Sequence, residues 1–173
     1  MIKEERIAIY KTYEDKFYDA IPASFLDRLG FFDAPASRHY HGAYPGGLFD
    51  HSLAVCERLI RLTKDNHLVW RSTRSPFVVG MYHDLCKCDL YVMKDNGEYD
   101  FNPNLTLKEH GAKSVMILAQ YMQLTEEEVL CIRYHMGAYE KEEWAEFDHA
   151  IRAYQTVLWT HTADMLASKT DGV

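Results

Sequence analysis

The sequence has few cysteines, no long apolar run and no extended segment rich in proline or glycine. Four cysteines in 173 residues are too few for a disulfide scaffold, and in a reducing compartment thiols are usually buried or reactive. No stretch approaches the roughly 18 apolar residues that span a bilayer, and the opening MIKEERIAIYKTYED lacks the apolar run of a secretory signal. We therefore expect a cytoplasmic protein without a membrane partner.

Positive charge is also scarce. The chain has 19 lysines and arginines against 26 aspartates and glutamates, a formal net charge of −7. Such a surface repels a phosphate backbone, so nucleic acid is not the expected partner, although a local basic pocket can hold a small phosphate. The length and a hydrophobic content of 47% are usual for one globular domain, and no internal repeat is present. A single domain spanning residues 1–173 is predicted.

Apolar residues recur at helical spacing along most of the chain. Capping signals agree: Thr125 and Glu128 form a capping box, and Pro22 can open a short helix. Two β-prone runs flank Asp95-Asn96-Gly97, a strong signal for a hairpin turn. The predicted fold class is all-α, a compact packing of six or seven helices with one small β-hairpin insertion. The helices are expected at about residues 4–20, 22–29, 48–63, 75–86, 106–122, 125–134 and 148–168.

Nine histidines are the main chemical signal, and one of them adjoins an aspartate. His83-Asp84 lies near the end of the apolar stretch PFVVGMYHDLC, where a buried carboxylate is costly unless it is paired or coordinates a cation. Lys87 is long enough to reach toward solvent instead. By itself such a pair is more often a satisfied hydrogen bond than a metal site. Cys86 and Cys88 are interpreted as bystanders, because their spacing is shorter than that of a zinc loop.

Five segments in order form a recognisable pattern: GGLFDHSLAVCERL, MYHDLCK, EHGAKSVMIL, IRYHMG and HTADMLAS. This pattern resembles the HD-domain superfamily of metal-dependent phosphohydrolases, whose minimal pattern is His, then His-Asp, then Asp. The two further histidines are similar to those of its dinuclear branch, and the resemblance extends to a group of uncharacterised bacterial HD-domain proteins. It implies a compact HD-domain helical fold, with an N-terminal helical part at residues 1–35 and a metal-binding core at residues 36–170.

The resemblance also implies a set of metal ligands and a bridging role for Asp84 between two ions. Imidazole nitrogen with carboxylate oxygen suits divalent transition metals such as Fe, Mn, Ni, Co or Zn, and the carboxylates are too few for a calcium cage. The ligands implied for the first ion are His51, His83, Asp84 and Asp164; His110 and His135 complete the second.

Three further residues are candidates for contact with a substrate phosphate. Lys87 follows Asp84 by three residues and can act as a point charge in catalysis; the alternative is a solvated lysine at a helix C-terminus. Lys113 and Ser114 follow His110 near a helix N-terminus, which favours anions, although Lys113 can equally be a surface charge. His161 is either an outer partner of Asp164 or a filler of its helix face.

The function predicted from this pattern is metal-dependent hydrolysis of a phosphate monoester or diester of a nucleotide or related small molecule, through a metal-activated water. Two alternatives remain open. Relatives with the same ligands include di-iron oxygenases, and an HD domain can also serve as a catalytically silent module that binds a nucleotide. An exonuclease is disfavoured by the acidic charge. The sequence leaves the oligomeric state and the substrate's identity undetermined.

Overall fold

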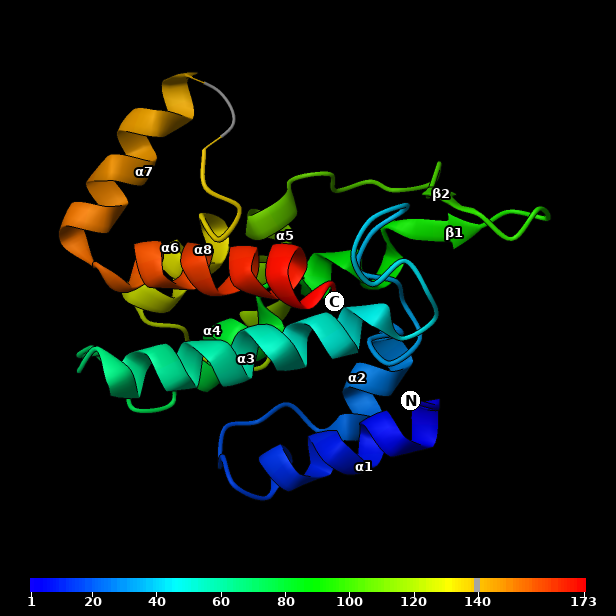
Figure 1. Cartoon of the computed structure of the whole chain (residues 1–173), viewed down its shortest axis with the longest axis horizontal. Coiled ribbons are helices and arrows are strands. Elements are labelled where there is room, and N and C mark those ends of the chain that lie inside the picture. Colours follow the sequence, from blue (N-terminus) through cyan, green and yellow to red (C-terminus); the bar gives the residue numbers. More distant parts are fainter. Residues whose placement is uncertain (139–140) are drawn as a thin grey trace.

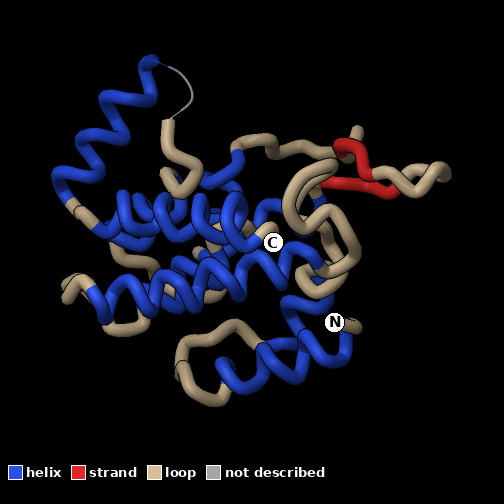
Figure 2. The backbone as a smooth tube through the Cα atoms, viewed as in Figure 1, coloured by secondary structure: helices blue, strands red, loops and turns tan. Residues whose placement is uncertain are grey.

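The computed structural model describes residues 1–138 and 141–173, with only the backbone of residues 141 and 142. Helices dominate it (Figures 1 and 2). The described part has eight α-helices, one more than the largest number predicted, together with the 3-10 helix η1 (Leu85–Asp89) and the π-helical turn η2 (Ala167–Asp171). The α-helices are α1 (Lys3–Glu14), α2 (Ala23–Leu29), α3 (Gly47–Asp65), α4 (Ser75–Tyr82), α5 (His110–Leu118), α6 (Glu126–Arg133), α7 (Lys141–Ala153) and α8 (Thr156–Leu166).

Five helices pack against one another in the middle of the molecule. α3 packs against α4 and α8, while α6 packs against α4, α5 and α8. All residues of α4 are buried, as its nearly continuous apolar sequence leads one to expect. α1 and α2 lie along one side, and α7 and the hairpin lie at opposite ends of the view in Figure 1. Among the described helices, none combines the length and the apolar character needed to cross a membrane.

The predicted hairpin is present, so an all-α fold with one small β-hairpin is confirmed. β1 (Tyr91–Met93) pairs antiparallel with β2 (Tyr99–Phe101), and Val92 lies opposite Asp100. In the turn, the N–H of Gly97 donates to the carbonyl of Lys94 at 2.9 Å. Gly97 has φ 82°, a left-handed conformation that glycine adopts without steric cost. The Asn-Gly sequence therefore sets the turn, as predicted.

Several predicted helix boundaries were wrong. The first helix ends at Glu14, and α5 begins at His110 rather than near Thr106, because the chain between β2 and α5 is needed to return from the hairpin. The predicted helix at 148–168 is two helices that meet at Tyr154. There the Tyr154 hydroxyl donates to Glu126 at 2.7 Å, a tertiary contact that apolar periodicity does not reveal.

A buried arginine holds the start of α3 in place. Arg6 of α1 donates two hydrogen bonds to the carboxylate of Asp50, at 2.9 and 2.8 Å, and is only 4% exposed. Its guanidinium lies against Gly46, where a Cβ would come within 2.4 Å of the arginine Nη1. A bidentate pair of this kind fixes orientation as well as distance. It therefore fixes the first turn of α3, which carries His51.

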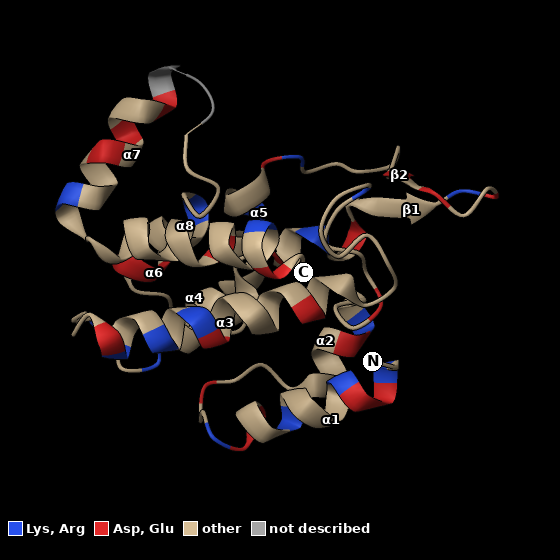
Figure 3. Cartoon of the chain, viewed as in Figure 1, with Lys and Arg blue, Asp and Glu red and all other residues tan. Residues whose placement is uncertain are grey.

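Charged residues of both signs are interspersed over the outer helices, and α7 carries a run of acidic residues (Figure 3). This distribution matches the net charge of −7. A surface of mixed sign produces no broad positive field that would attract a polyanion. The features that could attract an anion must therefore be local.

Close approach of α3 and α4 depends on Gly80. A Cβ on Gly80 would lie 2.5 Å from the Cα of Cys56 in α3. We expect Gly80→Ala to lower the free energy of unfolding by about 1–3 kcal/mol, the usual cost of overpacking, although alanine favours helix by about 1 kcal/mol. Chemical denaturation followed by circular dichroism measures the change, and a variant as stable as the parent would contradict this packing.

Candidate metal centre

Four histidines and two aspartates from five parts of the chain meet in the interior. The donors come from α3, from the junction of α4 with η1, from the start of α5, from the turn after α6 and from α8. Two groups among the described residues have ligand atoms within 4.8 Å of one another, and both contain Asp84. The six residues are those expected to bind metal: His51, His83, Asp84, His110, His135 and Asp164.

The backbone changes conformation where His83 and Asp84 stand. α4 ends at Tyr82, four residues earlier than predicted, and Asp84 has φ −107° and ψ 17° as η1 begins. On a continuous α-helix the two side chains would diverge by about 100°. Because the helix unwinds here, the Nε2 of His83 lies 3.4 Å from Oδ2 of Asp84.

The two oxygens of Asp84 face different pairs of histidines. Oδ1 lies 2.9 Å from Nε2 of His110 and 3.3 Å from Nε2 of His135. Oδ2 lies 3.4 Å from His83 and 3.6 Å from His51, each measured to Nε2. Asp84 is 1% exposed. One buried carboxylate thus stands between two pairs of imidazole nitrogens.

Asp164 of α8 extends the half of the cluster that surrounds Oδ2. Its Oδ1 lies 3.0 Å from Nε2 of His51, and the Nε2 atoms of His51 and His83 are 3.3 Å apart. Two ligand atoms each about 2.1 Å from one ion would be separated by roughly 3.0–3.4 Å at the angles of octahedral or tetrahedral coordination. The separations among these nitrogen and oxygen atoms are of that size.

Hydrogen bonds at the other ring nitrogen determine the tautomers of three histidines. Nδ1 of His83 lies 2.9 Å from the carbonyl oxygen of Gly80, Nδ1 of His135 lies 2.7 Å from that of Ile132, and Nδ1 of His51 lies 2.9 Å from the main-chain oxygen of Val173. These oxygens only accept, so each Nδ1 carries the proton and donates it. In the neutral rings, each Nε2 therefore presents a lone pair to the cluster.

These lone pairs face a carboxylate that also offers only lone pairs. Within the described part of the chain, neither oxygen of Asp84 nor Nε2 of His110 or His135 makes a hydrogen bond of normal geometry. Buried polar atoms without partners are rare in folded proteins. A cation among them removes the repulsion, so this donor set fits a metal ion better than the satisfied hydrogen bond considered from sequence.

The pKa directions favour an ionised Asp84 and neutral rings for His83 and His110, whereas the direction for His135 favours its charged form. Burial lowers the pKa of His83 and of His110. Burial also opposes charge on His135, but the adjacent carboxylate of Asp84 outweighs it and raises that pKa. Although burial disfavours its charge, the pKa of Asp84 is held well below its usual value by Lys87 and the surrounding histidines. An ionised carboxylate with neutral imidazoles is the state in which these groups bind metal.

His110 differs from the other histidines in its outer partner. Its Nδ1 lies 3.2 Å from Sγ of Cys86, and its side chain is 30% exposed. Burial raises the pKa of Cys86 to about 12, so the thiol is neutral and can either donate to or accept from the ring. Cys86 is therefore a neighbour of a candidate ligand, and neither Cys86 nor Cys88 belongs to the candidate metal groups among the described residues, in agreement with the sequence interpretation that the thiols are not ligands.

The lysines and serine expected to bind phosphate occupy different surroundings. Lys87 is only 6% exposed and its Nζ lies 2.7 Å from Oδ2 of Asp84, which rules out the solvated lysine considered above. Lys113 pairs with Asp89 at 2.5 Å, and the hydroxyl of Ser114 accepts from the N–H of Cys86 at 3.0 Å.

Lys113 and Ser114 are absent from the described residues that line the cavity beside the cluster. The direct phosphate contact expected of them is not supported by the geometry. Both follow His110 on α5, but they turn toward η1, where they have partners of their own. Sequence spacing placed them near the site without fixing the direction of their side chains.

His161 has a role that neither sequence alternative described. Its Nδ1 donates to the main-chain oxygen of His135 at 2.8 Å, so it supports the turn that carries this histidine. His41, in the loop before α3, lines the cavity beside the cluster, and its ring centroid lies 4.9 Å from that of His51. Burial, and then the neighbouring His51, lower the pKa of His41 to about 4, so it is neutral at pH 7.

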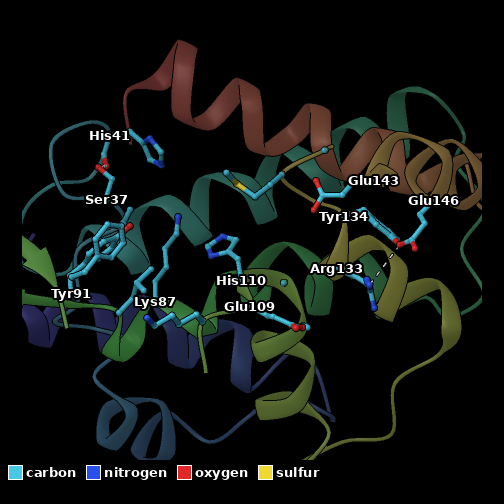
Figure 4. Close-up of a pocket in the computed structure, with 18 residues that line it drawn as sticks. Ser37, His41, Lys87, Tyr91, Glu109, His110, Arg133, Tyr134, Glu143 and Glu146 are labelled. Atoms are coloured by element: carbon cyan, nitrogen blue, oxygen red, sulfur yellow. Dashed lines mark hydrogen bonds and ion pairs between the residues drawn. The ribbon is translucent and has the colours of Figure 1, made fainter. Parts of the chain in front are cut away.

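An open cavity of about 690 Å³ adjoins the cluster, within the usual size range of small-molecule sites. His110 stands near its middle, with Lys87 and Tyr91 on one side and Tyr134 and Glu146 on the other (Figure 4). His110 and Lys87 both contact Asp84 and both line the cavity. A small molecule in the cavity can therefore reach the edge of the candidate metal centre.

Comparison with known proteins gave no match: no protein-family model, no curated protein and no solved structure is significantly similar to this chain.

Metal content tests the role of Asp84. We expect the purified protein to contain a divalent transition metal and Asp84→Asn to lose it, because the amide cannot bridge as a charged carboxylate does. Asp89→Asn, five residues along the chain and outside the cluster, is the matched control. Elemental analysis measures the metal content. Because bound metal stabilises only the folded state, a chelator should lower the melting temperature of the parent and of Asp89→Asn. It should leave the melting temperature of Asp84→Asn unchanged. Equal metal content in all three proteins would contradict the assignment.

Proposed function

We propose that the protein is a metal-dependent phosphohydrolase of the HD-domain type that acts on phosphate esters of small molecules. The observation that carries this proposal is the orientation of the Nε2 lone pairs of His51, His83 and His135 toward Asp84, fixed by hydrogen bonds at Nδ1. Such outer partners are typical of histidines that bind metal. The helical fold and the order of the donors along the chain fit the resemblance described above.

The donor geometry favours two ions bridged by Asp84. His51, His83 and Asp164 would hold one ion with Oδ2, and His110 and His135 would hold the other with Oδ1. Divalent Fe, Mn, Ni, Co or Zn suits these nitrogen and oxygen donors. When bound, such ions supply Lewis acidity: they lower the pKa of water and stabilise negative charge on a phosphoryl group.

The protein's own side chains would position the phosphate. Lys87 is buried, charged and directed at Oδ2 of Asp84, and it also lines the cavity. It can therefore attract a phosphate oxygen while holding the bridging carboxylate in place. His41 approaches from the opposite loop, and its neutral ring can donate a hydrogen bond to the substrate. No side-chain nucleophile is required in this arrangement.

Two substitutions of lysine separate the phosphate role from general charge effects. We expect Lys87→Met to lower kcat/KM for p-nitrophenyl phosphate about 100-fold or more, the usual loss when a preorganised charge at a reacting centre is removed. Lys113→Met, which removes a lysine paired with Asp89 outside the cavity, should change it less than about threefold. Phosphate release with either Zn or Mn measures both values.

The same experiment distinguishes the other functions. Equal kcat/KM in the two lysine variants would contradict a role for Lys87 in the reaction. Absence of phosphate release from the metal-loaded parent, with any of the five metals, would contradict hydrolysis of this ester. Oxygen uptake by the iron-loaded protein would then favour the di-iron oxygenase, and nucleotide binding without a product would favour the silent regulatory module.

A further inference from the structure

We infer that the aromatic side chains of the β-hairpin form a stacking platform for a planar ring on the substrate, which makes a nucleoside monophosphate the preferred class. This inference rests on the proposed function for the position of the phosphate. It assigns a binding role to Tyr91 and Phe101, which lie in the β-hairpin predicted from the sequence. The platform is defined as these two side chains.

The register of the hairpin places the two rings side by side. Tyr91 and Phe101 are direct cross-strand partners, so both side chains project from the same face. Their ring centroids are 5.6 Å apart with an interplanar angle of 35°. Both residues line the cavity. One face of the hairpin therefore forms part of the cavity wall.

Phe101 presents a largely exposed ring to the cavity. It is 52% exposed although it lines the cavity. The guanidinium of Arg38 lies 4.3 Å from its ring centroid and 3.4 Å from the carboxylate of Asp100. This contact holds the ring against the loop before α3 and leaves exposed aromatic surface available.

The platform is continuous with the candidate metal centre. Lys87 precedes Tyr91 by four residues, and both line the same side of the cavity (Figure 4). The Nζ of Lys87 is 2.7 Å from Asp84. The ester group of a phosphate held by Lys87 can therefore extend along this side of the cavity to the two rings. Aromatic side chains stack on nucleobases of any identity, so the platform selects a planar ring and not one base.

The side of the cavity away from Lys87 limits the number of phosphates. Glu146 lies there, and the hydroxyl of Tyr134 donates to it at 2.7 Å (Figure 4). Arg133 of the same wall lies 3.7 Å from Glu146 and offsets its charge, whereas the cation that contacts Asp84 is Lys87, on the side of the two rings. Additional phosphates extending past His110 would approach carboxylates, which costs free energy. A monophosphate fits this distribution better than a polyphosphate or a strand of nucleic acid.

Calorimetric binding of two ligands tests the platform. Adenosine 5′-monophosphate and ribose 5-phosphate share the phosphate and the sugar, and only the first carries a ring. We expect the zinc-loaded parent to bind adenosine 5′-monophosphate about tenfold or more tightly, the range expected from one stacked base. Phe101→Leu and Tyr91→Leu should bring the two affinities within about threefold without changing that for ribose 5-phosphate. Tyr91→Phe should retain the preference.

Matched controls separate stacking from hairpin stability. Val92 lies on the opposite face of β1, so Val92→Ala weakens the hairpin without removing a ring; Tyr18→Leu removes an aromatic ring from a fully exposed position. Both should keep the preference for adenosine 5′-monophosphate. Equal affinities in the parent, a preference that survives Phe101→Leu and Tyr91→Leu, or a preference lost in Val92→Ala would overturn the inference.

Phosphate release is assayed in the same samples, so that failure of the stacking platform can be distinguished from failure of the proposed hydrolysis. Ring-dependent binding without phosphate release supports the platform and contradicts hydrolysis. Phosphate release from both ligands with similar KM supports hydrolysis and contradicts the platform.

Discussion

The structure depends on one buried carboxylate surrounded by nitrogen lone pairs. Asp84 has no hydrogen bond of normal geometry to the described residues, yet four imidazole nitrogens lie 2.9–3.6 Å from its oxygens. Lys87 supplies one positive charge at Oδ2. A buried charge with incomplete pairing is costly, so the interior helices converge on a point that needs a cation. Both the fold and the proposed chemistry therefore require a cation beside Asp84.

The ends of two helices orient histidine lone pairs toward Asp84. His83 follows α4 and His135 follows α6, and each donates Nδ1–H to the carbonyl three residues earlier, that of Gly80 or Ile132. The last carbonyls of a helix lack intrahelical partners. One side chain thus completes a helix end, fixes its own tautomer and directs Nε2 to Asp84. His110 begins its helix instead of following it, and its Nδ1 contacts Sγ of Cys86 where the other two histidines contact a carbonyl oxygen.

The sequence predicted the helical class, the hairpin turn and, through the resemblance, the six residues that meet at the centre. These follow from periodicity, turn chemistry and an ordered pattern. The change of helix type at Asp84 and the break at Tyr154 depend on tertiary contacts, as do the partners of Lys113 and Ser114. The position of Tyr91 and Phe101 on the cavity wall likewise depends on how the hairpin packs. The proposed metals, the hydrolytic activity and the division at residue 35 remain predictions.

Diffraction from crystals of the manganese-loaded protein, recorded at the manganese absorption edge, tests the central claim most directly. The account predicts two anomalous peaks on either side of the Asp84 carboxylate, one contacting Oδ2 with His51 and His83, and one contacting Oδ1 with His110 and His135. A single peak, or none within bonding distance of Asp84, would contradict the bridging role of this carboxylate.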